Sequence, residues 1–311
     1  MFLTDFMDVL QLIYNNKLQF NIKIGEKFME IIIGKTAGFC FGVSNAVKKT
    51  EEELKNKKNV FCLGELVHNK QVTSELQNKG LTVIDNIEKA KQNVIIRAHG
   101  EPKETYKKAE KLELDVLDLT CPKVLRIHKI AQEYANNGFY ILLIGQKDHP
   151  ETIGTISYCG ENSAVIEKEE DIEDALNNFY VANIDKLLLI AQTTFSLEKF
   201  NNIISLITEK VNIEQIELEI KRTICDATRL RQEETKEIAK NVDVMIIIGG
   251  KHSSNTNKLY EISKKYCKAS ILIETKEELN VQFVKKFQKI GIMAGASTPQ
   301  KSIESVVEML N

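Results

Sequence analysis

Three cysteines, Cys40, Cys121 and Cys225, occur in the same local setting at widely separated points of the chain. Each follows a short apolar run and lies in a loop of small or polar residues, in EIIIGKTAGFC, LDVLDLTCP and KRTICDAT. Thiolates hold iron–sulfur clusters, and a cluster with three thiolate ligands has one iron without a protein ligand. Such an iron can bind and activate a substrate. The three settings therefore indicate a metal cluster with one open position.

The other three cysteines lie in different surroundings. Cys62 interrupts the apolar run VFCLGEL, and Cys267 lies in the helical pattern LYEISKKYCKAS. We expect both to be buried, because a free cysteine behaves as a small hydrophobe. Cys159, in the turn-like segment YCGEN, has no assigned role. A disulfide framework is disfavoured, since a long chain rich in Lys and Glu that starts without a secretory leader is typical of a reducing compartment.

Composition excludes several classes of protein. The chain has 311 residues, 43% of them hydrophobic, and a formal net charge of −2 with both signs interspersed. This pattern predicts a globular protein without the basic surface that binds nucleic acid or an anionic membrane. No apolar stretch approaches the roughly 20 residues of a spanning helix. We expect a cytoplasmic protein, and a monomer, because no large apolar surface helix is evident.

Short apolar runs alternate with charged, helix-length segments from Met29 onward. Runs rich in Ile, Val and Leu with this spacing are typical of parallel strands covered by helices on both faces, so the fold class is α/β. The runs are EIIIG, VFCLGEL, NVIIRAHG, LDVLDLT, YILLIGQ, SAVIE, KLLLIAQTT, VDVMIIIGG, SILIE and KIGIMAGAS. Residues 1–28 do not share this pattern, and we interpret them as an N-terminal extension, with Met29 as a candidate true start.

Polar residues gather where these strands should end, which is where ligands bind in open parallel sheets. They are His68, His99, His149, Thr193, the segment Ser253, Ser254 and Asn255, and Ser297. Small and hydroxyl residues between a strand and a helix expose backbone N–H groups that favour anions. Each has a simpler reading, because a loop histidine is often only solvated and Ser-Ser-Asn often only caps a helix. Three of the chain's five histidines fall at predicted strand ends, and this grouping favours a binding site.

Other features narrow the chemistry. His128 lies within the helical pattern VLRIHKIAQEY and has no expected role, and the role of His252, beside the anion-competent loop, stays open. Neither a Walker A sequence nor a G-x-G-x-x-G after a strand is present, so nucleotide and dinucleotide binding lack their usual sequence support.

These motifs together resemble a known family. Taken in order, TAGFCFGVSNAV, LGELVHN, RAHG, DLTCP, GQKDHPETIGT, AQTTFS, TICDATRLRQEE, GGKHSSNTNKL and AGASTP are similar to the LytB family of 4-hydroxy-3-methylbut-2-enyl diphosphate reductases. The resemblance runs from about residue 29 to the C-terminus. The departures are small: Thr36-Ala37 stands where a Pro-Arg pair is common, and His252 stands where some members have Asn.

The resemblance implies three small α/β domains with mainly parallel sheets, in a pseudo-threefold arrangement around one central 4Fe-4S cluster. Each domain brings one cysteine, so we place the domains at about 29–120 with Cys40, 121–221 with Cys121 and 222–311 with Cys225. The family reaction removes the hydroxyl of the allylic diphosphate with two electrons and two protons, giving isopentenyl and dimethylallyl diphosphates at the end of the methylerythritol phosphate pathway. A ferredoxin or flavodoxin supplies the electrons one at a time.

Roles for the candidate residues follow from this chemistry. Hydroxide is a poor leaving group, so an acid must protonate it, and Glu151 is the strand-end carboxylate with histidine and threonine neighbours. We assign Glu151 as the proton donor and Thr193 as the residue that orients it and binds the substrate hydroxyl. The diphosphate charge is distributed over many donors. These are His68, His99, His149, Ser253, Ser254, Asn255 and Ser297.

Two alternatives use the same three cysteines. An iron–sulfur dehydratase similar to quinolinate synthase would act on a dicarboxylate without net reduction, and the blocks GGKHSSNTN and AGAST argue against it. A non-enzymatic iron–sulfur sensor would need an output surface such as a DNA-binding helix pair or a basic patch, and the sequence offers none.

Overall fold

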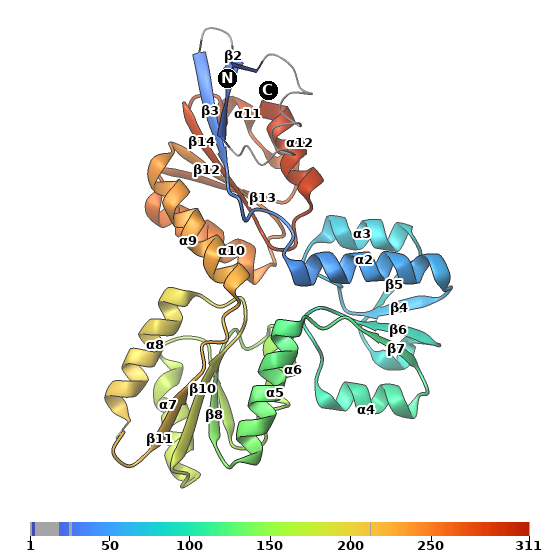
Figure 1. Ribbon diagram of the computed structural model, residues 1–311, viewed down its shortest axis with the longest axis vertical. Helices are drawn as coiled ribbons and strands as arrows, with labels where there is room; N and C mark the ends of the chain where they lie inside the picture. The colour runs from blue at the N-terminus through green and yellow to red at the C-terminus, as the bar shows by residue number, and fades with distance from the viewer. Residues whose placement is uncertain (1, 4–18, 25–26, 212, 311) are drawn as a thin grey trace. The chain divides into compact units, whose positions relative to one another are not determined.

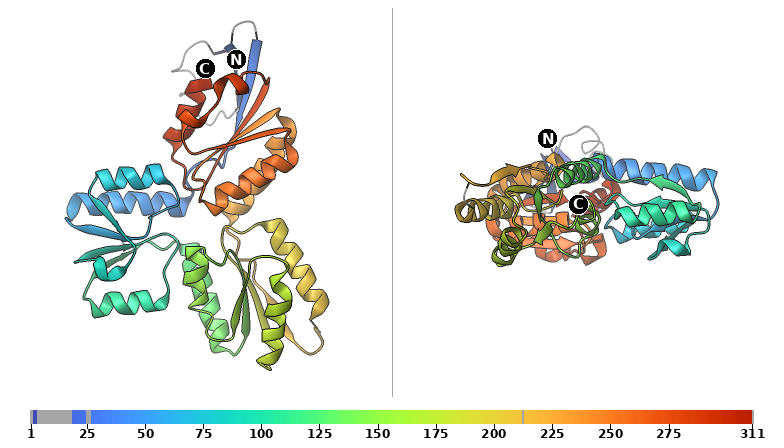
Figure 2. Two further views of the ribbon diagram at one scale, coloured as in Figure 1. Left: turned by 180° about the vertical axis from the view of Figure 1, so that it is seen from behind. Right: turned by 90° about the horizontal axis from the view of Figure 1, so that it is seen from below.

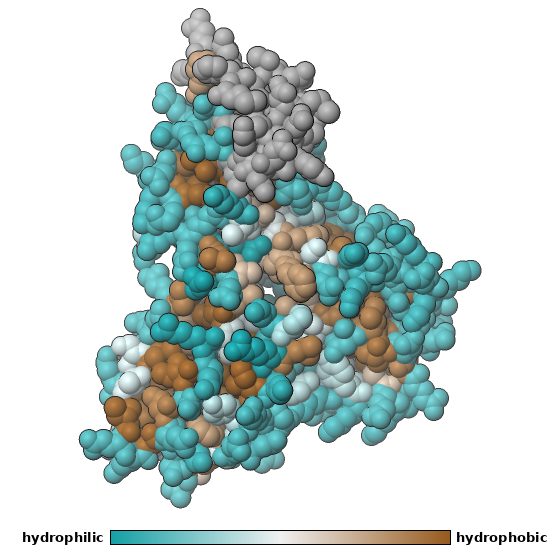
Figure 3. Space-filling view, viewed as in Figure 1, coloured by the Kyte–Doolittle hydropathy of each residue, from teal (hydrophilic) through white to brown (hydrophobic). Residues whose placement is uncertain are grey.

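The computed structural model describes residues 2–3, 19–24, 27–211 and 213–310 (Figure 1). By its internal contacts the chain divides into two compact units. Unit 1 consists of Met1–Phe41, His68–Val72 and Asp226–Asn311, so it combines the two ends of the chain. Unit 2 consists of Gly42–Val67 and Thr73–Cys225. None of the described helices is long and apolar enough to cross a membrane. Polar residues cover most of the visible face (Figure 3).

Unit 1 is built on one sheet with strand order β1-β2-β3-β14-β12-β13. All its pairs are parallel except β2 with β3, which are antiparallel. The strands are β1 (Phe2–Leu3), β2 (Gln19–Ile24), β3 (Lys27–Ile33), β12 (Val244–Ile248), β13 (Ala269–Ile273) and β14 (Lys289–Ala294). Strand β12, which lies between β14 and β13, is buried along its whole length. This burial explains its unbroken apolar sequence, because both faces of a parallel sheet are covered.

Alternate residues of these strands face two helical layers. Val244, Ile246 and Ile248 pack in one cluster with α12 residues such as Val306, whereas Met245 and Ile247 pack with α9 and α10 residues. This is the two-residue periodicity of a strand. The helical elements are α9 (Asp226–Asn241), α10 (Ser254–Tyr266), the 3-10 turn η2 (Lys276–Glu278), α11 (Val281–Val284) and α12 (Gln300–Leu310).

Unit 2 contains two four-stranded parallel sheets, with orders β5-β4-β6-β7 and β11-β10-β8-β9. The first is formed by β4 (Val60–Leu63), β5 (Leu81–Ile84), β6 (Asn93–Ile96) and β7 (Asp115–Asp118). The second is formed by β8 (Tyr140–Ile144), β9 (Ser163–Ile166), β10 (Lys186–Ala191) and β11 (Glu217–Ile220). In both sheets the middle strands are the most buried.

Helices flank both sheets of unit 2 (Figure 2). In the second sheet, Tyr140, Leu142 and Ile144 face α7 and α8, whereas Ile141 and Leu143 face α5. The helical elements are α2 (Phe41–Asn56), α3 (Lys70–Asn78), η1 (Ile87–Lys89), α4 (Lys103–Lys111), α5 (Pro122–Asn136), α6 (Pro150–Ile156), α7 (Asp171–Val181) and α8 (Leu197–Lys210). The first residue of α2 and the first three residues of α3 belong to unit 1.

The α/β class and the mainly parallel strands confirm the prediction, and every apolar run named above contains a strand. One strand belongs to a different sheet than the segment 29–120 suggests: β3 pairs with β14, because its apolar residues complete the C-terminal sheet. The domain boundaries stay a prediction. Part of the N-terminal extension, residues 19–24, forms β2 against β3, and residues 4–18 lie outside the described part of the chain.

Candidate functional site

A buried carboxyl group lies at the start of α6 in unit 2. Glu151 is 2% exposed, and Thr193 contacts both of its oxygens: the Thr193 N–H donates to Oε1 at 2.6 Å and the hydroxyl donates to Oε2 at 2.6 Å. Burial raises the pKa of Glu151 to about 7, and the two hydrogen bonds oppose this shift because they stabilise the charged form. A carboxyl group with a pKa near 7 can donate a proton at neutral pH.

Two of the strand-end histidines lie beside this carboxyl group. His149 caps α6, and its Nδ1 accepts a hydrogen bond from the Glu151 N–H at 3.1 Å. Because Nδ1 accepts, a neutral His149 carries its proton on Nε2. The His99 ring meets the His149 ring edge-on, with centroids 5.6 Å apart. The structure thus brings together Glu151, Thr193, His149 and His99, four of the predicted site residues.

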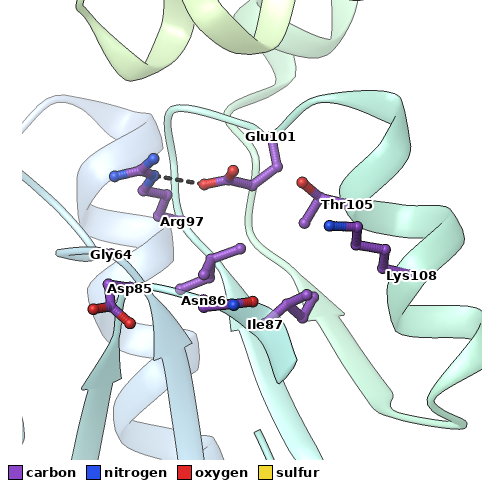
Figure 4. Close-up of a pocket in the computed structure, with 9 residues that line it drawn as sticks. Gly64, Asp85, Asn86, Ile87, Arg97, Glu101, Thr105 and Lys108 are labelled. Carbon is purple, nitrogen blue, oxygen red and sulfur yellow. Dashed lines mark hydrogen bonds and ion pairs between the residues drawn. The ribbon is translucent and has the colours of Figure 1, made fainter. Parts of the chain in front are cut away.

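The loop that carries His99 is closed by an ion pair. Arg97 Nε donates to Glu101 Oε1 at 2.8 Å, and both side chains are largely buried (Figure 4). The pair borders a cavity of about 560 Å³ at the ends of β4, β5 and β6. On its other side the loop packs on α6, because a Cβ at Gly154 would lie 3.5 Å from the Glu101 backbone. The ion pair thus closes the His99 loop on itself, and the close approach at Gly154 places this loop beside the helix of Glu151.

Cys121 and Cys225 lie next to these loops in unit 2. The Cys121 N–H donates to the carbonyl of Ala98, the residue before His99, at 3.0 Å. The Cys225 N–H donates to the carbonyl of Thr193, also at 3.0 Å. A Cβ at Gly42 would lie 2.7 Å from Cys121 Sγ, so only glycine fits beside this thiol without displacing it. Cys121 is thus hydrogen-bonded to the loop that carries His99, and Cys225 to the loop that carries Thr193, the partner of Glu151.

Cys40 lies in unit 1, in a loop that α9 holds in place. The Cys40 N–H donates to the Ala296 carbonyl at 3.1 Å, and Arg231 Nη2 donates to the Gly38 carbonyl at 2.7 Å. Glu234 accepts from the N–H of Thr36 at 2.8 Å and from the Thr36 hydroxyl at 2.6 Å. The Thr36 of the unusual Thr-Ala pair is therefore an anchor for the cysteine loop.

The remaining predicted residues gather in unit 1. Ser253 caps α10 by accepting a hydrogen bond from the Thr256 N–H at 3.3 Å, as a simple helix cap would. Ser297 donates to the His68 carbonyl at 3.0 Å, and a Cβ at Gly250 would lie 2.6 Å from that same oxygen. The loops that carry Ser253, Ser297 and His68 are therefore neighbours. Ser254, half-buried, is the first residue of α10.

Asn255 is the residue in this group that capping does not explain. It is 3% exposed, and neither its Oδ1 nor its Nδ2 has a hydrogen-bond partner among the described residues. A buried amide without partners destabilises the fold by about 1–3 kcal/mol. A ligand that accepts and donates hydrogen bonds at this position would remove that penalty.

The sequence model of the LytB protein family matches residues 31–311. The chain belongs to the LytB protein family. Among similar proteins of this family, 4-hydroxy-3-methylbut-2-enyl diphosphate reductase of Clostridioides difficile (strain 630) is 44% identical over 285 residues, which cover 91% of this chain and 99% of that protein. The protein of the same name from Aquifex aeolicus (strain VF5) is 42% identical over 283 residues, covering 89% and 94%.

Two solved structures are also similar to this LytB protein. One, described as (E)-4-hydroxy-3-methyl-but-2-enyl diphosphate reductase, the terminal enzyme of the non-mevalonate pathway, has a TM-score of 0.66 and 41% identity, covering 90% of this chain and 98% of that chain. The E-1-hydroxy-2-methyl-but-2-enyl-4-diphosphate reductase of Plasmodium falciparum has a TM-score of 0.82 and 30% identity, covering 90% and 87%. Neither the dehydratase nor the sensor alternative gains support from these relatives.

The buried cysteines of this LytB protein confirm the predictions made for them. Cys62 is fully buried and Cys267 is 8% exposed; Cys159, which had no assigned role, is also buried. Burial raises the pKa of the Cys62 and Cys159 thiols to about 12, which keeps them protonated. His128 is buried and stacks on Tyr158, and burial lowers its pKa to about 4. His252 is exposed.

Sequence reasoning missed the side chains that hold the loops. Gln192 accepts from the Gln146 N–H at 3.0 Å and donates to the Thr194 hydroxyl at 2.9 Å, joining the loops after β8 and β10. Arg231 and Glu234 anchor the Cys40 loop to α9 through hydrogen bonds to Gly38 and Thr36. The available signal for Gln192 was its position directly after β10 in AQTT; for the two α9 residues there was none, because charged residues on a helix usually face water.

Proposed function

We propose that this chain is a 4-hydroxy-3-methylbut-2-enyl diphosphate reductase, which removes the substrate hydroxyl with two electrons and two protons to give isopentenyl and dimethylallyl diphosphates. The observation that carries the proposal is the buried Glu151, whose pKa is raised to about 7 beside Thr193, with the Thr193 carbonyl bonded to the Cys225 N–H. The candidate proton donor Glu151 and the candidate cluster ligand Cys225 are thus linked by hydrogen bonds through one residue, Thr193. The names of the relatives agree with this reaction.

The cysteines fit a three-thiolate iron–sulfur centre. All six lie in the described residues as free thiols, and Cys40, Cys121 and Cys225 are the three that are half-buried rather than buried. Glycine at position 42 supports the same assignment, because a side chain there would displace the Cys121 thiol. We assign these three as the ligands of one 4Fe-4S cluster. Such a cluster would relay electrons from a reductant and would offer one iron without a protein ligand for the substrate.

The diphosphate group would be bound by the polar residues of the strand-end loops. Asn255 has two unpaired polar atoms to offer, and Ser253, Ser254 and Ser297 have hydroxyls in adjoining loops. His68, His99 and His149 would add ring nitrogens from the neighbouring strand-end loops of their units. Distributing several negative charges over many neutral donors binds the ligand without placing a permanent positive charge in the site.

Glu151 and Thr193 would carry out the proton chemistry. At neutral pH a pKa of about 7 leaves a large fraction of Glu151 protonated. That proton passes to the substrate hydroxyl, which leaves as water, and the resulting carboxylate is stabilised by the two hydrogen bonds from Thr193. The Thr193 hydroxyl can also turn to the substrate oxygen, since a hydroxyl both donates and accepts.

An anaerobic assay tests the proposal. The protein is purified with its cluster reconstituted, supplied with a one-electron reductant, and assayed for conversion of 4-hydroxy-3-methylbut-2-enyl diphosphate to the two products. We expect Glu151→Gln to lower turnover by roughly 10²–10⁴-fold, the usual contribution of a general acid, with iron content unchanged. The control is Glu104→Gln, an exposed carboxylate of α4. Cys225→Ser should lose the cluster itself.

Each assignment has its own contrary result. Near wild-type turnover in Glu151→Gln with an intact cluster would remove Glu151 as the acid. Full iron content in Cys225→Ser would refute the ligand set. No conversion by the wild type despite a spectroscopically confirmed 4Fe-4S cluster would reject the reaction.

A further inference from the structure

The helix that begins at Cys121 has an unusual solvent face. Cys121 occupies the N-cap of α5. In the first two turns of this helix, the exposed side chains include Lys123, Leu125, Arg126 and Lys129. The opposite side of the helix is buried in unit 2 through Val124, Ile127, His128 and Ala131. We call the four exposed residues the α5 face.

Lys123 lies in the first turn of α5, where a positive charge opposes the helix dipole, and Arg126 and Lys129 follow in the next turn. The N-terminus of a helix favours acidic side chains, and α5 has none in its first turn. Within the described chain, none of Lys123, Arg126 and Lys129 is in an ion pair. By contrast, Arg229 near the start of α9 is balanced by Asp226 and Glu233. Residues that break a local rule without compensation are expected where function requires them.

An exposed apolar side chain accompanies these charges. Leu125 is 44% exposed, between the cations and four residues after Cys121. Exposed apolar residues also follow the other two candidate ligands in sequence: Phe41 directly follows Cys40 and is 80% exposed, and Leu230 is the fifth residue after Cys225 and is 45% exposed. Exposed apolar side chains surrounded by charge are typical of surfaces that bind another protein.

We propose that the α5 face is the docking site for an acidic one-electron carrier protein that reduces the centre held by Cys121. The inference rests on the proposed function, whose reaction takes up two electrons. The chain has no sequence signature of a nucleotide cofactor that could supply them. Two encounters balance the reaction: each oxidises the carrier by one electron. The two electrons and two protons replace the C–O bond of the allylic alcohol with a C–H bond and release the oxygen as water.

The composition of the face fits such a partner. Unpaired cations attract an acidic protein over a distance and accelerate its approach at low ionic strength. A small apolar contact at Leu125 would add limited affinity, as expected for a carrier that must dissociate after each electron, since electron-transfer complexes have small interfaces. A stable dimer of this chain is not favoured by the same face, because three like charges would meet three like charges.

The test measures carrier binding and two electron routes separately. Holoprotein variants Arg126→Glu and Leu125→Ser are compared with wild type for the Kd of a purified acidic bacterial ferredoxin at low and high salt. Turnover is measured with that ferredoxin and with reduced methyl viologen. Matched controls are Lys111→Glu and Leu112→Ser at the end of α4, where Leu112 is 45% exposed.

We expect Arg126→Glu to raise the ferredoxin Kd at least tenfold at low salt, with the difference shrinking at high salt as exposed charges are screened. Leu125→Ser should raise the Kd at both salt concentrations, and both variants should keep viologen-driven turnover within twofold of wild type. An unchanged Kd in both variants would overturn the docking site. Equal losses with ferredoxin and viologen would also overturn it, because the residues would then act on the centre itself.

Failure of the proposed function gives a different pattern. A wild type that binds ferredoxin through the α5 face but converts no substrate with either reductant would leave the docking site in place and reject the reaction. If Arg126→Glu does not fold, Lys129→Glu one turn further along the same face carries the same expectation.

Discussion

Replacing Glu151 with glutamine should change how the stability of the protein depends on pH. Burial raises the pKa of Glu151 from 4.5 to about 7 in the folded protein. In the unfolded chain the side chain is exposed and should titrate near its ordinary value. Between these two pH values the folded protein therefore keeps a proton that the unfolded chain has lost.

The sign follows from this difference in bound protons. Where the folded state binds more protons, stability falls as the pH rises, which is the reverse of the behaviour of a carboxylate in a salt bridge. A difference of about 2.5 pKa units corresponds to about 3 kcal/mol at 1.36 kcal/mol per unit. This stability is fully present below pH 4.5 and is lost as the pH rises through about 7. The glutamine side chain of the Glu151→Gln variant cannot titrate, so the variant lacks this loss.

The assay is urea unfolding of the apoproteins at several pH values. The free energy of unfolding of Glu151→Gln relative to wild type should rise by about 3 kcal/mol between pH 4 and pH 8, since all other groups titrate in both proteins. Glu104→Gln, at an exposed position, should give a flat difference. A flat difference for Glu151→Gln as well would show that the carboxyl group is ionised in the normal range, and the reasoning for it as the acid would fail.

Three further predictions concern the partners of the site. Thr193→Val removes the hydroxyl contact to Glu151 Oε2 and should raise the pKa of Glu151 by about one further unit, since a hydrogen bond to a charged group contributes about 1.5–3 kcal/mol. The pH–rate profile should therefore shift to higher pH, and a profile at the wild-type position would contradict this. Asn255→Leu should raise the KM for the diphosphate at least tenfold without lowering the Tm, because a buried unpaired amide is removed; an unchanged KM would exclude Asn255 from the binding site. Glu234→Gln weakens three contacts to residues 35 and 36 and should accelerate loss of iron from the holoprotein under a chelator, whereas the exposed Glu237→Gln should not.

The central strands could be predicted from sequence because of their burial. Strands such as β8 and β12 are buried along their whole length, so their apolar runs are unbroken and hard to mistake. The short edge strands β5 and β11 were missed. β11 reads ELEI, whose glutamates favour a helix in isolation, and its side chains are only partly buried or exposed. Pairing with β10 at one edge decides its structure, and no local pattern reports such pairing.

The candidate site was predicted through the rule that ligands bind at the ends of parallel strands. That rule located His99, His149 and Thr193, and the structure brings these three together with Glu151. It could not locate Arg231 or Glu234, which lie on a helix and contact loop residues almost 200 positions earlier in the chain. Their function depends on tertiary contacts alone.

The polar groups of the two units divide into those that hold loops and those that face a ligand. Gln192 and Glu234 are hydrogen-bonded to backbone and hydroxyl groups of loop residues, so they position a loop whether or not a ligand is bound. Asn255 has no partner among the described residues, and Glu151 keeps a proton that water would remove. Each condition destabilises the free protein. In unit 1, a ligand that pairs with the Asn255 amide would relieve the first, and in unit 2, a group that accepts the Glu151 proton would relieve the second.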